Sequence, residues 1–246
     1  MTSLTSCLDA ESASRRAATE ISRRLQSARE ERGQAHLALS GGSTPARAYE
    51  LLAEAIESWQ QIHIWFADER CVGPEDEESN YLLARQTLLD RASGLVERNV
   101  HRMQGELGPE QGAERYAEEL RSHAPLQHDG LPALDVIVLG IGPDGHVASL
   151  FPGASTLEAQ APLLCLGVHD SPKPPPERIT LTLPVLQAAR RCVLLVTGAG
   201  KADALDAMLG EPSRHVPASL LRRGRLSVIA DDAASPQAPK ELTDQS

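Results

Sequence analysis

The side chains best suited to acid–base chemistry lie in one short segment near the middle of the chain, GIGPDGH (140–146). His146 is a candidate proton carrier because the imidazole is the one side chain whose ordinary pKa allows proton exchange near neutrality. Asp144 stands two residues before it, so the two groups could act as a pair. A lone loop histidine is more often a surface residue. The position of His146 beside a glycine turn that follows an apolar run favours a catalytic role instead.

The same segment matches the dinucleotide-binding pattern GxGxxG, but its own residues argue against that reading. Pro143 lacks the backbone N–H that would face a pyrophosphate, and Asp144 would add negative charge beside it. The pattern also normally begins a domain, with an acidic residue at the end of the next strand, and neither condition is met here. We therefore predict that no dinucleotide binds.

A second segment, SGGSTP (40–45), has the composition of an anion-binding loop. Its two glycines would let backbone N–H groups turn toward a phosphate, and the N-terminus of a following helix would add partial positive charge. Pro45 suits the first helical turn, and Ser43 or Thr44 could cap it. A Walker A pattern is absent, which disfavours a nucleoside triphosphate. A capped tight turn without a ligand is the alternative.

Charged residues near other expected strands could complete a phosphate clamp. The triplet Asp68-Glu69-Arg70 follows one apolar run, Arg178 begins another, and Lys201 begins an expected helix. Each alone is explained as a solvated surface charge. Together with the glycine loop they could hold a dianion, since charge-assisted hydrogen bonds contribute roughly 1.5–3 kcal/mol each.

An α/β sheet would bring these segments together. Short apolar runs predict strands, and helical spacing of apolar residues predicts helices between them. The expected strands are 35–39, 62–66, 134–140, 163–168, 178–183, 192–197 and 226–230, and the expected helices are 9–32, 45–58, 79–91, 109–123 and 199–209. This alternation implies a doubly wound, mostly parallel sheet with helices on both faces. Ligands bind such sheets beyond the carboxyl ends of the strands, where the polar segments cluster.

Composition narrows the class of protein further. The 246 residues are 41% hydrophobic and 24% charged, which excludes a disordered or collagenous chain. An aromatic content of 3% and a net charge of −10 argue against nucleic-acid binding. No apolar run approaches the roughly 20 residues of a membrane span. Four scattered cysteines, without a CxxC or a zinc-site spacing, indicate free thiols and a cytoplasmic location.

We expect a single α/β domain at 1–232 and a flexible tail at 233–246. No GxSxG elbow is present, and no cysteine has a histidine near it in sequence, so direct attack by water fits better than a covalent acyl-enzyme.

Six ordered blocks cover nearly the whole chain and resemble the 6-phosphogluconolactonase family. They are LALSGGSTP (37–45), FADERCV (66–72) with SNY (79–81), NVHRMQGE (99–106), LDVIVLGIGPDGHVASLFPG (134–153), SPKPPPERITLTLP (171–184) and VTGAGKADAL (196–205). The resemblance implies a modified Rossmann-like fold, shared with glucosamine-6-phosphate isomerase/deaminases. It also implies hydrolysis of 6-phospho-D-glucono-1,5-lactone to 6-phosphogluconate in the oxidative pentose phosphate pathway, without a metal or an organic cofactor.

The resemblance also implies roles for individual residues. His146 would be the catalytic acid and base, with Asp144 and Asp68 lining the site and orienting His146 or the water. The residues expected to bind substrate are Ser40, Gly41, Gly42, Ser43, Thr44, Arg70, Gly142, Gly145, Arg178 and Lys201. Either Arg70 or backbone N–H groups between Gly142 and His146 would stabilise the developing oxyanion.

Two other functions stay open. Isomerase/deaminases carry a glutamate five residues after the histidine, used in ring opening, and Phe151 stands there in this chain. A noncatalytic sugar-phosphate sensor is usually joined to a DNA-binding module, and the roughly 33 residues before the first expected strand leave little room for one. The expected partner is therefore a small sugar-phosphate lactone, with no nucleic acid and no membrane, and the expected state is a monomer or homodimer.

Overall fold

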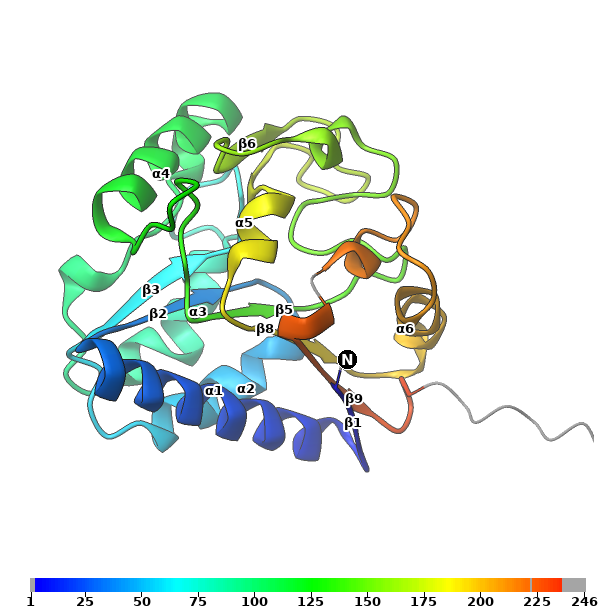
Figure 1. The fold of residues 1–246 in the computed structure, drawn as a ribbon, viewed down its shortest axis with the longest axis horizontal. Coiled ribbons are helices and arrows are strands. Elements are labelled where there is room, and N and C mark those ends of the chain that lie inside the picture. Colours follow the sequence, from blue (N-terminus) through cyan, green and yellow to red (C-terminus); the bar gives the residue numbers. More distant parts are fainter. Residues whose placement is uncertain (1–2, 222, 236–246) are drawn as a thin grey trace, which may run out of the picture.

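A six-stranded parallel sheet runs through the middle of the molecule (Figure 1). The computed structural model describes residues 3–221 and 223–235. The strand order is β1-β9-β8-β5-β2-β3, and every neighbouring pair is parallel. The strands are β1 (Ser3–Cys7), β2 (Ala35–Leu39), β3 (Ile62–Phe66), β5 (Val136–Leu139), β8 (Cys192–Val196) and β9 (Leu226–Asp231). The expected doubly wound, mostly parallel α/β sheet is confirmed.

Helices cover both faces of this sheet. In Figure 1, α1 and α2 lie on one side, whereas α4 and α5 lie on the other. The helices are α1 (Ala10–Arg32), α2 (Ser43–Ala55), α3 (Asn80–Thr87), α4 (Pro109–His123), α5 (Leu183–Ala188) and α6 (Ala202–Leu209). The expected helices at 9–32 and 109–123 therefore match within one residue, whereas α5 was not predicted.

Helix α1 illustrates how the sequence defines an element. The side chain of Asp9 caps it by accepting a 2.7 Å hydrogen bond from the Ser12 N–H. Gly33 ends it with a left-handed φ of 77°, which suits glycine best. Its buried residues, Ala13, Ala17, Ile21, Leu25 and Ala28 among them, repeat every three or four positions and face the sheet.

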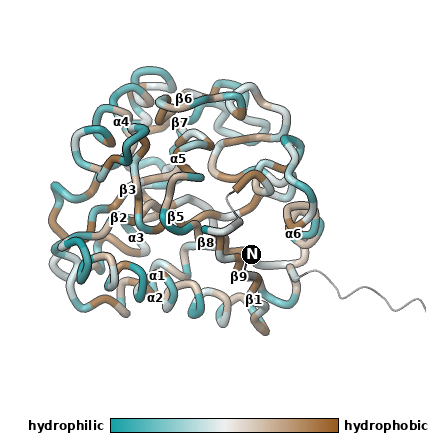
Figure 2. The backbone as a smooth tube through the Cα atoms, in the orientation of Figure 1, coloured by the Kyte–Doolittle hydropathy of each residue, from teal (hydrophilic) through white to brown (hydrophobic). Residues whose placement is uncertain are grey.

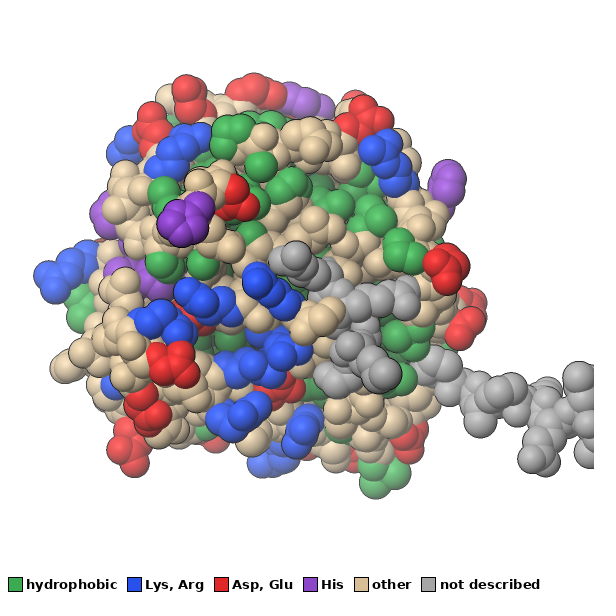
Figure 3. Space-filling model, in the orientation of Figure 1, with side chains coloured by type: hydrophobic (Ala, Val, Ile, Leu, Met, Phe, Trp, Pro, Cys, Tyr) green, Lys and Arg blue, Asp and Glu red, His purple; other side chains and the backbone are tan. Residues whose placement is uncertain are grey.

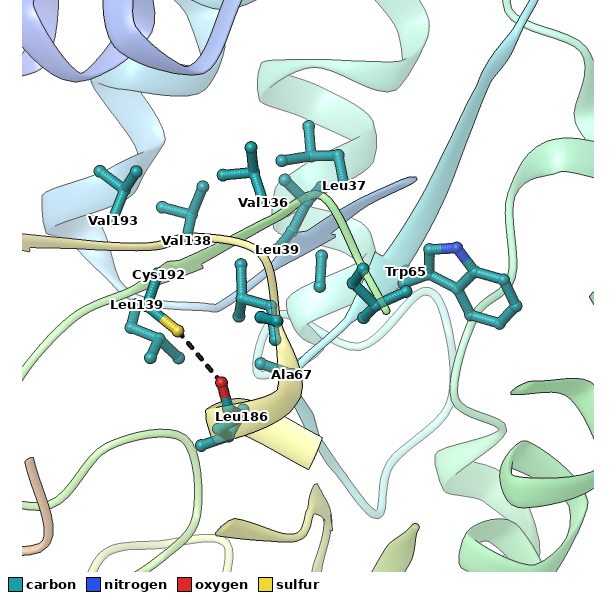
Figure 4. Close-up of a cluster of buried hydrophobic side chains, with 14 of the residues drawn as sticks. Leu37, Leu39, Trp65, Ala67, Val136, Val138, Leu139, Leu186, Cys192 and Val193 are labelled. Atoms are coloured by element: carbon teal, nitrogen blue, oxygen red, sulfur yellow. Dashed lines mark hydrogen bonds between the residues drawn. The ribbon is translucent and has the colours of Figure 1, made fainter. Parts of the chain in front are cut away.

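The core is made by apolar side chains of the central strands and of the helices that cover them, and Figure 2 shows hydrophobic stretches of backbone in the interior of the molecule. Side chains alternate between the two faces of each strand. In Figure 4, Val136 and Val138 of β5 point to one face, whereas Leu139 points to the other, beside Cys192. All four side chains are buried. Strands buried on both faces position the polar segments at their carboxyl ends rigidly.

A second, three-stranded antiparallel sheet carries part of the candidate site and corrects the sequence-based expectation. It has the order β4-β7-β6, with β4 (Asp68–Arg70), β6 (Cys165–Val168) and β7 (Arg178–Leu181). The apolar runs 163–168 and 178–183 were expected in the parallel sheet, but they pair with each other here. Ala67 joins the two sheets, because its N–H donates to the Leu39 carbonyl of one and its carbonyl accepts from the Leu181 N–H of the other.

The N-terminus forms an edge strand that the sequence did not predict. The segment SLTSC of β1 has too few apolar residues for the pattern, yet it pairs with β9 along its whole length. The stretch before the first expected strand thus contributes one strand to the sheet and continues into α1. At the other end, Ala234 of the expected tail is fully buried, and the Ser235 hydroxyl lies 2.8 Å from that of Ser6. The remaining tail, 236–246, lies outside the described residues.

Two further findings concern the described residues alone. All four cysteines are free thiols. No helix combines the length and the apolar character needed to cross a membrane.

Candidate active site

The polar segments that follow β2, β3 and β5 meet in one cleft of about 260 Å³. Because parallel strands end at the same edge of the sheet, segments far apart in sequence become neighbours there. The small antiparallel sheet contributes Asp68 and Arg70 from β4 and Arg178 from β7 to the lining of this cleft. The lining residues include Ser40, Gly41, Gly42, Ser43, Thr44, Asp68, Arg70, Gly142, His146, Arg178 and Lys201 from the predicted set, together with Asn80, Ala148, Lys173 and Pro174. The predicted residues Asp144 and Gly145 are not among the lining residues, although Asp144 contacts His146, which is.

His146 and Asp144 form a hydrogen-bonded pair. The Nδ1 atom of His146 lies 2.5 Å from Oδ1 of Asp144. The imidazole packs against Phe151, with 4.7 Å between ring centroids. Burial lowers the pKa of His146 below its ordinary value, and the negative charge of Asp144 partly opposes this change. No described residue hydrogen-bonds Nε2, so this atom is available to a proton donor in the cleft.

The turn beneath this pair requires glycine at position 142. A Cβ at Gly142 would lie 2.1 Å from Nδ1 of His146 and 2.4 Å from Oδ1 of Asp144. The Gly142 N–H donates to the His146 carbonyl at 2.9 Å and so closes the turn. Gly145 has a left-handed φ of 82°, and its N–H donates to the Gly142 carbonyl. The glycines thus position the pair.

Asp68 is fixed by two buried neighbours that were not among the predicted site residues. The hydroxyl of Ser149 donates to Oδ2 of Asp68 at 2.8 Å. The Nδ2 group of Asn80 donates to the Asp68 carbonyl at 2.8 Å and lies 3.3 Å from Oδ1. The segment SNY was visible as part of the resemblance, whereas nothing in the sequence indicated that Ser149 faces Asp68. Ala148, with a left-handed φ of 48°, turns the chain at this point.

Glu69 points away from the cleft and binds the N-terminus of α3. Its carboxylate accepts hydrogen bonds from the N–H groups of Asn80 and Tyr81, at 2.7 and 2.8 Å, and from the Ser79 hydroxyl at 3.1 Å. Burial raises the pKa of Glu69 to about 7, and the backbone N–H donors partly oppose this rise. A carboxylate at a helix N-terminus is favourable, and here it fixes the helix that presents Asn80 to the cleft.

Four cationic residues line the cleft, and Arg178 is the most firmly held. Its Nε donates to the carbonyl of Pro175, and its Nη2 donates to those of Lys173 and Pro174, at 3.1–3.2 Å. Arg70 is its register partner across the β4–β7 pair. The other two cations are Lys173 and Lys201. Lys173 was not among the predicted binding residues, although its segment, SPKPPPERITLTLP (171–184), is one of the blocks of the resemblance.

The glycine loop lines the cleft as expected, but the cap of the helix that follows it differs from the prediction. The Ser40 hydroxyl donates to the Val138 carbonyl, and Tyr49 bonds both the N–H and the carbonyl of Ser40. Gly42 occupies the N-cap position, with φ at 101° and no side-chain cap. The expected cap by Ser43 or Thr44 is therefore wrong, because α2 already begins at Ser43. The hydroxyls of both residues instead stand at the edge of the cleft.

Three hollows of larger volume lie elsewhere, and two of them are on the α1 side of the molecule. One, of about 570 Å³, lies between α1 and the end of α2. The other, of about 460 Å³, is lined by Arg23, Arg24, Arg32, Arg190, Arg191 and Arg225, and Figure 3 shows basic side chains gathered over α1. Neither hollow contains a histidine among its described lining residues. The third hollow, of about 270 Å³, contains His101 but none of the glycine-loop residues and neither His146 nor Asp68 among its described lining residues. The cleft at the ends of β2, β3 and β5 therefore remains the candidate active site.

Comparison with known proteins places the chain in a family. The family model for glucosamine-6-phosphate isomerases/6-phosphogluconolactonase matches residues 8–230. The 6-phosphogluconolactonase of Streptomyces coelicolor is 38% identical over 92% of this chain and 90% of its own length. That of Homo sapiens is 40% identical over 81% of this chain and 79% of its own. The crystal structure of the Thermotoga maritima 6-phosphogluconolactonase superimposes with a TM-score of 0.81 at 28% identity, covering 94% of this chain and 99% of that one.

Proposed function

The chain belongs to the glucosamine-6-phosphate isomerase/6-phosphogluconolactonase family, and on that premise we propose that its cleft hydrolyses 6-phospho-D-glucono-1,5-lactone to 6-phosphogluconate. This is a step of the oxidative pentose phosphate pathway. The observation that carries the proposal is the His146–Asp144 pair, which faces a cleft walled by four cations.

His146 serves as base and then as acid. Its unprotonated Nε2 takes a proton from water as the water oxygen attacks the lactone carbonyl carbon. The tetrahedral intermediate collapses by breaking the bond between that carbon and the ring oxygen, and the imidazolium returns the proton to the ring oxygen. Asp144 accepts the hydrogen bond from Nδ1 and stabilises the imidazolium between the two steps. The products are a carboxylic acid and a free hydroxyl group.

Arg70 is the better candidate for the oxyanion donor. The backbone alternatives are largely engaged, since the N–H groups of Gly142 and Gly145 close the turn and that of His146 faces Asp144. By contrast, Arg70 lines the cleft, and among the described residues only Nη1 of its guanidinium nitrogens is engaged, with Glu78. A fixed positive charge beside the reacting carbonyl stabilises the developing negative charge.

The phosphate group is held by the remaining cations and the glycine loop. Arg178, Lys173 and Lys201 supply positive charge, and the loop at residues 41–44 supplies backbone and hydroxyl donors. Holding the phosphate far from the reacting carbon fixes the sugar, so that attack by water becomes effectively intramolecular. This local charge also overcomes the net charge of −10.

Phe151 disfavours the isomerase/deaminase alternative. Its ring packs on His146 and lies 5.8 Å from the guanidinium carbon of Arg178, in the position of the glutamate expected for ring opening. A phenyl ring cannot transfer a proton. The intact His146–Asp144 pair likewise favours an enzyme over a noncatalytic sensor.

We further propose a cytoplasmic monomer or homodimer, and size-exclusion chromatography with light scattering tests the oligomeric state.

The decisive experiment measures acid release from freshly generated 6-phosphogluconolactone, with spontaneous hydrolysis subtracted and glucosamine 6-phosphate assayed in parallel. We expect turnover of the lactone and no release of ammonia. His146→Ala should lower kcat by roughly 10²–10⁴, the usual contribution of general acid–base catalysis. Ammonia release by the wild type, or near-normal turnover by the variant, would contradict the proposal.

A further inference from the structure

A cluster of histidine and glutamate side chains lies away from the cleft, at the C-terminal end of α4. Glu119 and His123 are four residues apart and therefore share one face of the helix. His101 approaches them from the segment between α3 and α4, which runs beside β3, where its N–H donates to the Ile64 carbonyl. One donor atom from each of the three side chains lies within 4.8 Å of the others.

We propose that His101, Glu119 and His123 form a zinc-binding site. Two imidazoles and one carboxylate are a donor set that zinc uses in four-coordinate sites with a water in the fourth position. Calcium and magnesium would require mostly oxygen donors, which excludes them here.

The present distances are close to those of a metal site. The Nδ1 of His123 lies 3.3 Å from Oε1 of Glu119, and the Nδ1 of His101 lies 2.7 Å from the same oxygen. Ligand bonds of about 2.0–2.1 Å in a tetrahedron separate neighbouring donors by roughly 3.3 Å. The His123–Glu119 distance already fits, and the His101–Glu119 distance must open by about half an ångström as the metal replaces the hydrogen bond. The donor atoms of His101 and His123 lie within 4.8 Å of each other, so the exposed His123 side chain adjusts to close the site.

The burial of the three side chains fits a site that is partly preformed. The His101 side chain is 1% exposed and fixed, with its ring stacked on Trp65 at 3.9 Å between centroids. Glu119 and His123 are 36% and 50% exposed, so they can adjust and leave the fourth position open to water. The site therefore combines one rigid ligand with two adaptable ones.

His63 supplies the outer contact that metal-binding histidines normally have. Its Nδ1 lies 2.9 Å from Nε2 of His101. When Nδ1 of His101 binds a metal, Nε2 carries the proton and donates to His63, which orients the ring. Spacing rules for cysteine and histidine do not detect this set, because its ligands come from two segments and one of them is a glutamate.

Zinc binding to the full-length, chelator-treated protein tests the site. We expect calorimetry with Zn²⁺ to give one site per chain, and Co²⁺ to give the visible absorption of a four-coordinate complex. At 100-fold excess over Kd, the melting temperature should rise by about 5 °C or more. Exposed His123→Ala and near-isosteric Glu119→Gln should each weaken binding by at least about tenfold. His128→Ala, which removes an exposed histidine outside the cluster, should bind as the wild type does.

Several results would overturn the site. These are the absence of Zn²⁺ binding by the wild type, unchanged affinity in both His123→Ala and Glu119→Gln, or an equal loss in His128→Ala. The measurements do not involve the lactone, so their outcome is independent of the proposed enzymatic activity.

Discussion

Replacing Gly142 by alanine tests whether the position of His146 controls catalysis. The added Cβ would lie 2.1 Å from the imidazole Nδ1, whereas an ordinary contact needs at least 3.4 Å. The ring must therefore move by about 1.3 Å, and a misplacement of about 1 Å at a reacting group can cost roughly 10² in rate. We expect kcat to fall by about 10² or more. Because the contacts are to the catalytic pair itself, KM should change far less.

The folded structure should survive this substitution. Gly142 does not have a left-handed φ, so alanine is compatible with its backbone. Overpacking typically costs about 1–3 kcal/mol, which corresponds to a fall in melting temperature of about 2–4 °C per kcal/mol for a chain of this size.

The assay is initial-rate hydrolysis of freshly generated lactone, with the spontaneous rate subtracted, alongside thermal unfolding. Gly73→Ala is the matched control, because a Cβ there meets nothing within 4 Å and Gly73 does not line the cleft. A Gly142→Ala enzyme that keeps kcat within about threefold of the wild type would refute the argument that the turn positions the catalytic group.

Three further predictions follow from the same geometry. Asp144→Asn removes the charge that stabilises the imidazolium, so we expect kcat to fall by roughly 10² or more. The negative charge of Asp144 also raises the pKa of His146. In the variant, the acid limb of the kcat/KM profile, where protonation of His146 stops catalysis, should therefore move to lower pH. Ser149→Ala leaves a buried oxygen of Asp68 without its 2.8 Å donor, and we expect calorimetric or denaturant unfolding to record a loss of about 1–3 kcal/mol. Arg178→Ala should mainly raise KM in steady-state kinetics, because the guanidinium is proposed to hold the phosphate; a large fall in kcat at unchanged KM would instead assign it to the carbonyl.

The sequence predicted the parallel sheet well because its strands are buried on both faces. Runs such as AHLAL (35–39) and IHIWF (62–66) contain almost only residues that fit such a strand, and both matched to the residue. The edge strand β1 contains a single leucine among polar residues, so its pairing with β9 depends on tertiary context. Periodicity also does not reveal which sheet a strand joins, and β7 consequently appeared as a strand of the wrong sheet.

Residues close in sequence were the predictable part of the candidate site. Asp144 and His146 share one loop, and their pairing could be expected from spacing alone. By contrast, Ser149 reaches Asp68 across 81 positions of the chain, and Lys173 reaches the cleft from a loop whose sequence did not by itself indicate a contact with the phosphate-binding residues. Such contacts arise from the meeting of the two sheets, which no local pattern encodes.

The pairing of Arg70 with Arg178 in the small sheet couples ligand binding to the stability of the fold. Like charges opposite each other on neighbouring strands repel, and negative charge of a bound ligand near them weakens that repulsion. Ligand present at 100 times its Kd adds about 2.7 kcal/mol to the free energy of unfolding. The folded protein is therefore expected to resist thermal unfolding better with a bound sugar phosphate than without one.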